Sequence, residues 1–234
     1  MSAEKLKEEL LAASNKNKAR DLARFFKTGK GEYGEGDIFI GVTVPVNRSI
    51  SKKYLHLSPT ELIPLLRSDI HELRLSALLC MVEQYKSRHT TSARKQEIVD
   101  TYIDNTRYIN NWDLVDLSVY NIIGAHLLHL DRQLLYRWAD STLLWEQRMA
   151  IVATMWFIRH GDYNDTIAIA EKLCHHPHDL IQKAVGWLLR EMGKRDEKRL
   201  IDFLDKHYTT LPRTLLRYAI EKFPPHLRNH YMGK

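Results

Sequence analysis

The chain of 234 residues contains only two cysteines, Cys80 and Cys174, which lie far apart in the sequence. So few thiols exclude a disulfide framework of the kind that small extracellular domains need, and they fit a reducing compartment. A chain of this length can bury a hydrophobic core of its own, either as one large domain or as a short array of repeats.

Long hydrophobic segments are also missing. The N-terminus, Met1-Ser2-Ala3-Glu4-Lys5-Leu6, carries charged residues and no apolar block, so it lacks the pattern of a secretory signal. The longest apolar run, 149–158, is interrupted by Thr154 and is too short to span a bilayer. We therefore expect a soluble, cytoplasmic protein with no membrane partner.

Several common catalytic and metal-binding motifs are absent. No nucleophilic serine elbow, cysteine–histidine pair or Walker motif occurs in the sequence. The run Cys174-His175-His176-Pro177-His178 contains metal-ligand residue types, but it crosses a helix break and has no matching second cluster. His126 and His129 share a helix face without a carboxylate between them. We expect a loop and a helix start at 174–178, surface or packed histidines elsewhere, and neither a metal nor a cofactor.

Glycine is scarce, and four of the ten glycines fall in one segment, 27–37. This segment is not a phosphate-binding P-loop, because no Lys-Ser or Lys-Thr pair follows its last glycine into a helix. It also lacks the preceding strand of a dinucleotide site. Two interpretations stay open: the loop at 29–36 is a mobile connector, or it is a backbone-accessible loop that lies close to a phosphate chain together with Lys27 and Lys30.

Helical periodicity runs through the whole chain, and strand alternation is almost absent. Ser58-Pro59-Thr60-Glu61 is a capping box with proline at the first helical position, which predicts a helix start. A second helix is expected from Ile70 through Met81. Further helices are expected over 93–109, 112–128, 131–139, 145–159, 163–174, 178–192, 197–207 and 212–222.

The spacing of these helices predicts the architecture. Helices of about 10–18 residues joined by short polar turns indicate antiparallel pairs, and a period of about 35–40 residues per pair suits HEAT-like repeats. We therefore expect an all-α fold, a solenoid of stacked helix pairs in a single domain over 1–234. A compact helical bundle is the alternative that periodicity leaves open.

The most informative stretch opens one of these helices: Asn110-Asn111-Trp112-Asp113-Leu114-Val115-Asp116. Trp112 and Asp116 are four residues apart and so lie on one face, which continues into core-like residues. A carboxylate on a mainly apolar face is costly unless something compensates it. Asp116 is therefore a candidate for chemistry, whereas Asp113 at the helix start suits capping or the helix dipole.

Arg148 opens a helix that is apolar nearly all round. Such a helix is buried, so the guanidinium at its start needs a carboxylate partner, and Asp113 and Asp116 are the candidates. As a structural feature this is an ion pair between helices. As a functional feature it is a cation that orients the carboxylate and keeps it ionised.

A basic stripe follows one helix face, where Lys183, Trp187, Arg190 and Lys194 occur at spacings of four, three and four. Cations for phosphates and a flat apolar ring for sugar or base are what a nucleic-acid footprint needs. The alternative is a solvated face whose tryptophan packs into the next helix. Gly186 permits close approach of a second backbone in either case.

The net charge does not decide between these interpretations. The formal excess of +6 is modest; it favours an anionic partner such as nucleic acid but would also suit an ordinary basic enzyme.

Together these residues resemble the AlkD-type DNA glycosylases, helical-repeat proteins that excise alkylated purines. The resemblance covers most of the chain, and its strongest segments are 111–116, 145–148 and 181–191. The first and last segments are specific, and their occurrence in this order makes chance an unlikely explanation.

Carried over by position, the resemblance implies a catalytic role for four residues. Asp116 matches the family's catalytic carboxylate, Trp112 and Trp187 match its two sugar-contacting tryptophans, and Arg148 matches its arginine near the lesion backbone. The family's aromatic residue near the N-terminus falls near Phe25 or Phe26, where better-known members carry tyrosine.

The resemblance also implies the partner. We expect a monomer that binds duplex DNA with alkylated purines through a concave basic surface. Its activity would be hydrolysis of the N-glycosidic bond of cationic N3- or N7-alkylated purines, with Asp116 stabilising the oxocarbenium-like sugar or positioning water. The DNA contacts expected outside the catalytic group are Lys183, Arg190, Lys194, Lys27, Lys30 and Phe25.

Two alternatives from other classes remain. A non-catalytic HEAT-like scaffold would bind structured DNA or a protein partner, since fold alone does not secure catalysis. It would have no reason to combine Trp112, Asp116, Arg148 and Trp187. An unrelated hydrolase with Asp113 and Asp116 as its carboxylate pair would cleave sugars without requiring DNA.

Overall fold

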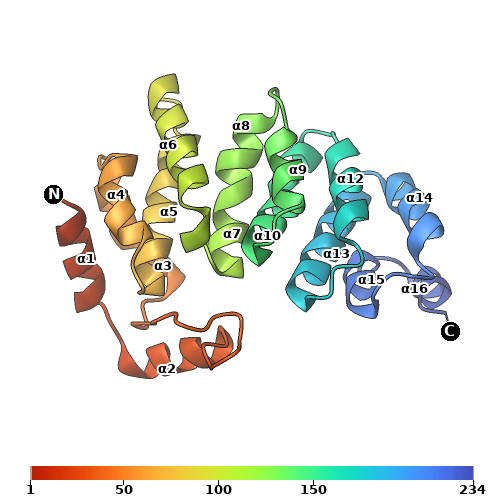
Figure 1. The fold of residues 1–234 in the computed structure, drawn as a ribbon, viewed down its shortest axis with the longest axis horizontal. Coiled ribbons are helices and arrows are strands. Elements are labelled where there is room, and N and C mark those ends of the chain that lie inside the picture. The colour runs from red at the N-terminus through yellow and green to blue at the C-terminus, as the bar shows by residue number, and fades with distance from the viewer. Residues whose placement is uncertain (1, 234) are drawn as a thin grey trace. The chain divides into compact units, whose positions relative to one another are not determined.

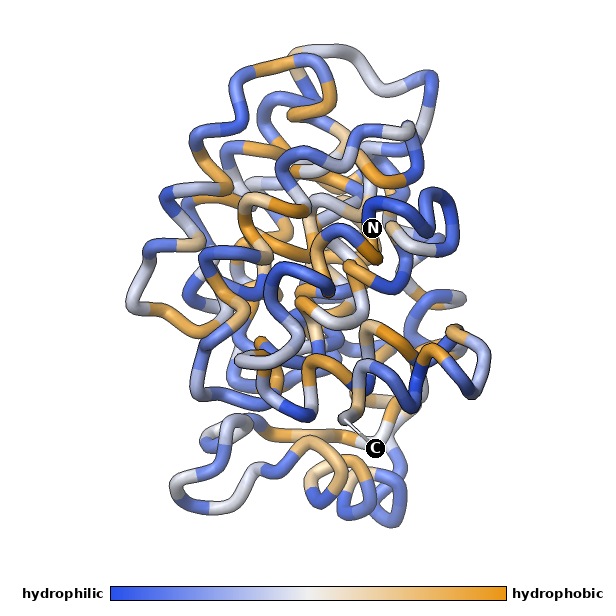
Figure 2. The backbone as a smooth tube through the Cα atoms, turned by 90° about the vertical axis from the view of Figure 1, so that its right-hand side faces the viewer, coloured by the Kyte–Doolittle hydropathy of each residue, from blue (hydrophilic) through white to orange (hydrophobic). Residues whose placement is uncertain are grey.

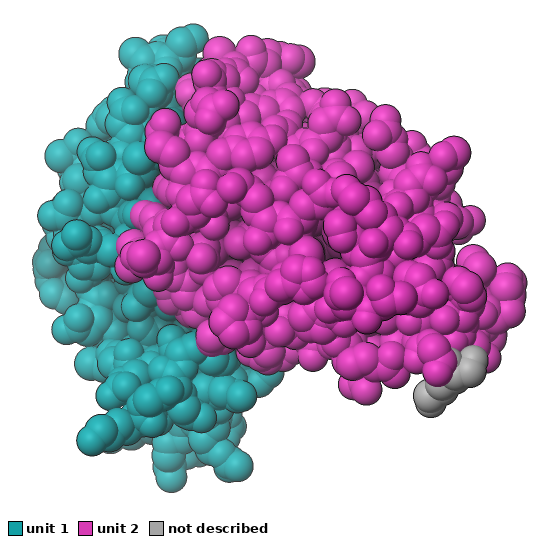
Figure 3. All heavy atoms as spheres, turned by 45° about the vertical axis from the view of Figure 1, so that its right-hand side comes forward, with its two compact units in different colours: residues 1–118 teal, residues 119–234 magenta. Residues whose placement is uncertain are grey.

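The computed structural model describes residues 2–233 and divides into two compact units, residues 1–118 and residues 119–234. The units are coloured separately in Figure 3. The boundary falls between Ser118 and Val119, inside a continuous helical segment. The expectation of one domain over the whole chain stays a prediction.

The predicted all-α class is confirmed, and within each unit neighbouring helices pack as antiparallel pairs. Within residues 2–233 there is no β-strand, only an isolated parallel bridge between Ile38 and Ile70. Hydrophobic and hydrophilic residues alternate at short intervals along the helices, which is the pattern of helices that bury one face (Figure 2). None of these helices combines the length and the apolar character that crossing a bilayer requires.

Unit 1 consists of the N-terminal helices shown in red to green in Figure 1. Its elements are α1 (Ala3–Ala12), α2 (Lys16–Phe25), α3 (Val44–Ser51), the 3₁₀ turn η1 (Lys52–Tyr54), α4 (Pro59–Leu66), α5 (His71–Lys86), α6 (Ser92–Asp104), the 3₁₀ turn η2 (Thr106–Tyr108) and α7 (Trp112–Val119), whose last residue belongs to unit 2.

Four helices of unit 1, α1, α2, α4 and α6, begin after a residue whose side chain caps them. The capping box at Ser58 is confirmed: the Ser58 hydroxyl accepts from the backbone N–H of Glu61 at 3.2 Å, and the Glu61 carboxylate accepts from the N–H of Ser58 at 2.7 Å. Helix α5 lies at the centre of the unit and is buried on nearly all sides. Its polar residues therefore need partners inside the protein.

The segment 37–42 is tied to the start of α5, and this contact positions the site described below. The backbone N–H of Ile38 donates to the Asp69 carbonyl at 3.0 Å, and the N–H of His71 donates to the Ile38 carbonyl at 2.8 Å. The buried carboxylate of Glu72 accepts from the backbone N–H groups of this segment at 2.8–3.2 Å. These hydrogen bonds to an ionised group are charge-assisted and hold the irregular segment against α5.

Unit 2 consists of the remaining helices, shown in green to blue in Figure 1. Its elements are the π-helical turn η3 (Tyr120–Gly124), α8 (Ala125–Leu127), α9 (Gln133–Ala139), α10 (Leu144–Ala153), α11 (Met155–Arg159), α12 (Asn164–Leu173), α13 (Asp179–Gly193), α14 (Glu197–His207), α15 (Arg213–Ala219) and α16 (Pro225–Tyr231).

Two of the sequence expectations for unit 2 are confirmed by packing. The helix that follows Arg148 is buried all round, through Ala153. Helix α13 packs most extensively against α15, and Gly186 lies at this contact. A Cβ at position 186 would lie 2.5 Å from the Leu215 carbonyl oxygen and 2.6 Å from the Tyr218 Cβ, so the two backbones approach only because residue 186 is glycine.

Some predicted helix boundaries are wrong. The helix expected over 145–159 is two helices that meet at Thr154, whose hydroxyl donates to the Ile151 carbonyl at 2.6 Å. A threonine that bonds back to its own helix bends it. The helix expected over 93–109 ends at Asp104 and continues as the 3₁₀ turn η2.

The contact between α13 and α15 predicts an unusual response to alanine. In an open helix Gly→Ala would stabilise by about 0.5–1 kcal/mol, but Gly186→Ala should destabilise by about 1–3 kcal/mol, because its methyl group overlaps a backbone carbonyl. Urea unfolding measures the difference. Gly193→Ala is the matched control, since its methyl meets only the movable side chain of Leu200 and should cost less. A Gly186→Ala protein as stable as wild type would contradict this packing.

Candidate active site

Helix α7 presents Trp112 and Asp116 one turn apart on the same face, as the sequence predicts. Both residues are half-buried, whereas Leu114 and Val115 between them are fully buried in the core. The helix start is fixed by Asn111, whose buried side-chain oxygen accepts from the backbone N–H of Trp112 at 2.9 Å. The two candidate side chains therefore stand on a rigid element.

The indole of Trp112 rests on a stack of aromatic rings. Phe26 stacks on it with a centroid distance of 5.2 Å, and Phe39 stacks on Phe26 at 5.0 Å. The imidazole of His71 completes the stack, 4.5 Å from the Phe39 ring. Ring pairs in this geometry are favourable beyond the area that they bury, so the indole is held from beneath.

Phe25 occupies a different position from Phe26. Its side chain is 63% exposed, and its ring meets the edge of Trp112 at a centroid distance of 6.0 Å. Of the two positions named from the sequence, Phe26 thus supports Trp112 from within, and Phe25 is the one that faces solvent beside it.

The same imidazole carries two hydrogen bonds to carboxylates. His71 Nδ1 lies 3.1 Å from Asp37 Oδ2, and His71 Nε2 lies 2.9 Å from Asp113 Oδ2. Only 2% of the His71 side chain is exposed. His71 thus links the segment 37–42 to the first turn of α7.

Asp37 has further partners that Asp113 lacks. The Arg74 guanidinium donates to Asp37 Oδ1 at 2.6 Å, and the Asn111 amide donates to Asp37 Oδ2 at 3.1 Å. Burial alone would raise the pKa of Asp37. The hydrogen bond from His71 and the charge of Arg74 outweigh burial and hold that pKa below its ordinary value of 3.8.

The structure confirms the expected position of Asp113 at the start of its helix but not a capping role. It lies in the first turn of α7, but its Oδ2 is paired with His71 rather than with a backbone N–H of its own helix. Its Oδ1 is buried and has no hydrogen-bond partner. A carboxylate that ties two segments together in this way is ill suited to act as the acid of an ordinary sugar hydrolase.

Asp116 lies one turn further along α7, and its negative charge acts on the buried residue Tyr102. Burial raises the pKa of Tyr102, and the negative charge of Asp116 raises it further. The Tyr102 hydroxyl is hydrogen-bonded to the Ser118 hydroxyl at 2.9 Å, which fixes the buried side of α7 beneath Asp116.

The glycine-rich loop is closed on its own glutamates. The backbone N–H of Gly29 donates to Glu32 at 2.9 Å, and that of Gly31 donates to Glu35 at 2.7 Å. Gly34 packs directly against the Phe26 carbonyl, where any Cβ would overlap it. The loop thus has internal structure, and two of the N–H groups that could have met a phosphate are occupied by carboxylates.

Lys27 and Lys30 flank this loop and are exposed. Neither has an ion-pair partner among residues 2–233. Lys27 adopts a left-handed backbone conformation with φ of 53°, which non-glycine residues rarely take.

In unit 2, Arg148 is buried at the start of α10, as the sequence predicts. One of its guanidinium nitrogens donates to the Leu180 carbonyl at 2.5 Å, which ties α10 to the start of α13. A carboxylate partner for this arginine stays a prediction.

The basic stripe lies along α13 with its tryptophan half-buried. Each of its cations faces a carboxylate within unit 2: Lys183 pairs with Asp179 at 2.7 Å, Lys194 pairs with Glu191 at 2.6 Å, and Arg190 pairs with Glu221. The stripe is therefore less positive than its sequence suggests. A phosphate would have to replace these carboxylates.

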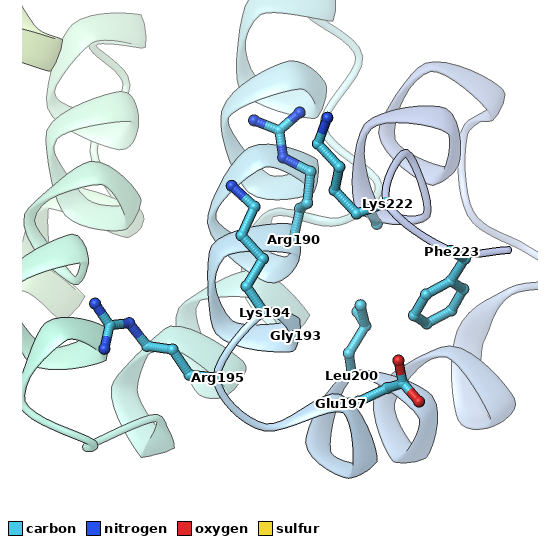
Figure 4. Close-up of a pocket in the computed structure, with 9 residues that line it drawn as sticks. Arg190, Gly193, Lys194, Arg195, Glu197, Leu200, Lys222 and Phe223 are labelled. Carbon is cyan, nitrogen blue, oxygen red and sulfur yellow. The ribbon is translucent and has the colours of Figure 1, made fainter.

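A cavity of about 400 Å³ adjoins the end of this stripe, with Arg190 and Lys194 in its lining (Figure 4). The sequence analysis missed two further cations there, Arg195 and Lys222. Arg190 and Lys222 extend in the same direction at its rim, whereas Arg195 points away from them. Arg195 and Lys222 come from the turns after α13 and α15, where no periodic pattern marks them.

The histidine run at 174–178 forms a connector and a helix start, as expected. His176 Nδ1 accepts from the N–H of His178 at 3.0 Å, and His178 Nδ1 accepts from the N–H of Leu180 at 3.1 Å, which caps α13. In the described part of the chain no group of three potential metal ligands occurs. His129 is exposed and His126 is half-buried.

The fold and these side chains define a helical-repeat protein that presents a carboxylate beside a supported tryptophan. A family model described as DNA alkylation repair enzyme matches residues 6–223, and the chain belongs to this family. A solved structure described as a predicted DNA alkylation repair enzyme from Enterococcus faecalis shares the fold. It has a TM-score of 0.70 and 15% identity, over 91% of this chain and 97% of that one. A search of curated proteins finds no significant match.

The predicted catalytic residues divide between the units, Trp112 and Asp116 in unit 1 and Arg148 and Trp187 in unit 2. The sequence analysis missed Asp37, His71 and the support of the indole by Phe26. The available signal was a histidine beside Glu72 and Arg74, at the start of a helix whose next turns are mainly apolar. Its partners lie 34 and 42 residues away, so no local spacing reveals them.

The buried pairing of Asp37 predicts a pH-dependent effect of its removal. Asp37→Asn should lower the free energy of unfolding by about 3 kcal/mol near neutral pH, since the substitution leaves Arg74 without its carboxylate. Because the folded pKa lies below 3.8, this stabilisation is present above pH 3.8 and is lost as the pH falls through the folded value.

Urea unfolding of both proteins over a series of pH values measures the difference. Asp21→Asn, which changes an exposed carboxylate on α2, is the control and should alter stability by less than about 0.5 kcal/mol. A difference for Asp37→Asn that persists unchanged through acid would contradict the assigned pairing.

Proposed function

We propose that the protein is a DNA glycosylase that hydrolyses the N-glycosidic bond of cationic N3- or N7-alkylated purines in duplex DNA. The observation that carries the proposal is the start of α7, where half-buried Trp112 and Asp116 share a face over a buried aromatic and ionic support. Membership of the DNA alkylation repair enzyme family supplies the class of substrate.

The chemistry of the lesion explains why so few groups suffice. Alkylation at N3 or N7 puts a positive charge on the purine, so the base can leave as a neutral molecule without a general acid. The sugar then develops oxocarbenium character, and fixed negative charge beside it lowers the barrier. Water adds to the anomeric carbon, loses a proton and leaves an abasic site.

We assign the negative charge to Asp116, which either stabilises the sugar cation or takes the proton of the attacking water. Trp112 and Trp187 are assigned to the sugar, where each indole face can contribute about 0.5–2 kcal/mol of cation–π stabilisation. The packing of Trp112 against Phe26 supports this role, because a ring that is already fixed loses little freedom when the sugar binds. Arg148 is assigned to the backbone at the lesion.

Selection in this proposal comes from the lability of the cationic lesion rather than from a pocket that reads an extruded base. Bulky N-alkyl groups should then be tolerated. The reaction needs neither a metal nor a cofactor, and the protein acts as a monomer within the base excision repair of alkylation damage.

DNA binding is assigned to cations and to one exposed ring. Lys27 and Lys30 beside the glycine-rich loop are exposed and unpaired among residues 2–233, and exposed Phe25 adjoins Trp112. Phosphates would replace the carboxylates that now pair with Lys183 and Arg190.

The proposed function makes a prediction about the carboxylate of Asp116. Asp116→Asn should lower the single-turnover rate of N7-methylguanine release from methylated duplex DNA by at least about a hundredfold. The loss of one fixed charge at a developing cation has this order of effect. DNA affinity should stay within about threefold of wild type, because the change removes a transition-state interaction.

Asp104→Asn is the matched control, since it removes an exposed carboxylate of unit 1 and should leave the rate unchanged. Full activity of Asp116→Asn would refute the role given to this residue. Tight DNA binding by wild-type protein without any base release would favour the non-catalytic scaffold.

The proposed function makes another prediction, about the basic stripe on α13. Lys183→Ala and Arg190→Ala should each reduce the slope of log K against log salt for DNA binding by about one, because each variant releases one counterion fewer. Fluorescence anisotropy over a range of salt concentrations measures the slope.

Lys198→Ala provides the control, because Lys198 makes the same kind of i,i+4 ion pair on α14 as Lys183 makes on α13. It lies outside the stripe and should leave the slope unaltered. If the Lys183 and Lys198 variants gave equal slopes, Lys183 would belong to a solvated face rather than to the DNA footprint.

A further inference from the structure

His71 is a buried titratable side chain that joins three segments of unit 1, and the proposed reaction does not use it directly. Its ring contacts Asp37 through Nδ1 and Asp113 through Nε2, while His71 itself begins α5. Asp113 immediately follows Trp112 and precedes Asp116 by one turn of α7. A contact that fixes Asp113 therefore also fixes the start of α7, the helix that carries Trp112 and Asp116.

We propose that His71 is a positioning residue: held as an imidazolium between Asp37 and Asp113, it fixes the first turn of α7 and with it Trp112 and Asp116. This inference rests on the proposed function, since it assigns to His71 the placement of groups that act on DNA.

The donor count supports the charged form. A neutral imidazole has one N–H donor, whereas both nitrogens of His71 face carboxylate oxygens, at 3.1 and 2.9 Å. With both carboxylates ionised, only the imidazolium satisfies both contacts. In a neutral ring one lone pair would face a carboxylate at this distance and repel it.

The two carboxylates differ in the hydrogen-bond donors that remain to them when the His71 ring loses its proton. Asp37 keeps Arg74 and Asn111 as donors whatever the state of the ring. Asp113 has His71 as the partner of Oδ2 and none for its buried Oδ1. The hydrogen bond between His71 and Asp113 is therefore the weaker of the two links, and it is the one that depends on the proton of His71.

The surroundings of the ring contain few other charges. On α5 these are Arg74, which pairs with Asp37, and Glu72, whose carboxylate is taken up by backbone N–H groups of the segment 37–42. Helix α7 contributes Asp113. The His71 ring also packs against two aromatic side chains, with centroid distances of 5.1 Å to Phe26 and 4.5 Å to Phe39. Loss of the His71 proton would thus remove a positive charge and leave one carboxylate of this buried cluster uncompensated.

The direction of the titration follows. Burial favours the neutral ring and lowers the pKa of His71, but the hydrogen bonds to Asp113 and Asp37 outweigh it and hold this pKa above its ordinary value of 6.5. The imidazolium link is complete below pH 6.5 and is lost as the pH rises through the folded value. Base release should therefore decline on the alkaline side with the same midpoint as the His71 ring.

A pair of amide variants separates the two ends of the link. In His71→Gln the amide nitrogen takes the place of Nε2 and can donate to Asp113. In His71→Asn it takes the place of Nδ1 and can donate only to Asp37. The glutamine variant should keep the single-turnover rate within about threefold of wild type and lose the alkaline decline. The asparagine variant should lose about tenfold, as expected for one charge-assisted hydrogen bond.

DNA affinity should be the same in all three proteins, since no phosphate contact changes. Equal rates for the two variants, or a loss that appears only in DNA affinity, would overturn the positioning role.

Wild-type protein provides a measurement that does not depend on how the variants fold. A titration of the ¹⁵N-labelled His71 ring by NMR should show both ring N–H groups at pH 6.5 and a midpoint above 6.5. A ring that is neutral at pH 6.5, or a rate that ignores its titration, would overturn the inference while leaving the proposed function intact. Absence of base release from wild type at every pH would overturn both.

Discussion

A buried imidazole between two carboxylates is the interaction on which the arrangement of unit 1 depends. Helix packing alone would allow the start of α7 to slide, because apolar contacts have no direction. The contacts of His71 with Asp37 and Asp113 are directional, and they join three segments at one ring. The face of the same ring takes part in the aromatic stack that leads from His71 to Trp112. The hydrogen bonds and the stacking together hold the start of α7, which carries Trp112 and Asp116.

Much of the fold is predictable because periodic patterns encode it. Buried and exposed positions repeat every 3.6 residues, so α12, α13 and α14 appear in the sequence close to their observed bounds. The shared face of Trp112 and Asp116 follows from the same period. Gly186 marked a close helix contact for a steric reason that needs no knowledge of the partner helix.

The remaining features depend on contacts between distant residues. No spacing pairs His71 with Asp37, and the role of Asp113 changed once that partner was known. The stripe on α13 reads as three free cations, but Glu221, which pairs with Arg190, lies 31 residues further along. The break at Thr154 escaped detection because a threonine within an apolar run also suits an unbroken helix.

Unit 1 therefore places an ionisable group of α7 beside a fixed indole, in a member of the DNA alkylation repair enzyme family. The central claim is that this arrangement serves cleavage of the glycosidic bond rather than removal of the alkyl group. Mass spectrometry of methylated duplex DNA after incubation with wild-type protein and a metal chelator tests it most directly. The account predicts free N7-methylguanine or N3-methyladenine and matching abasic sites. Unmodified guanine or adenine still attached to the DNA, or an unchanged duplex, would contradict it.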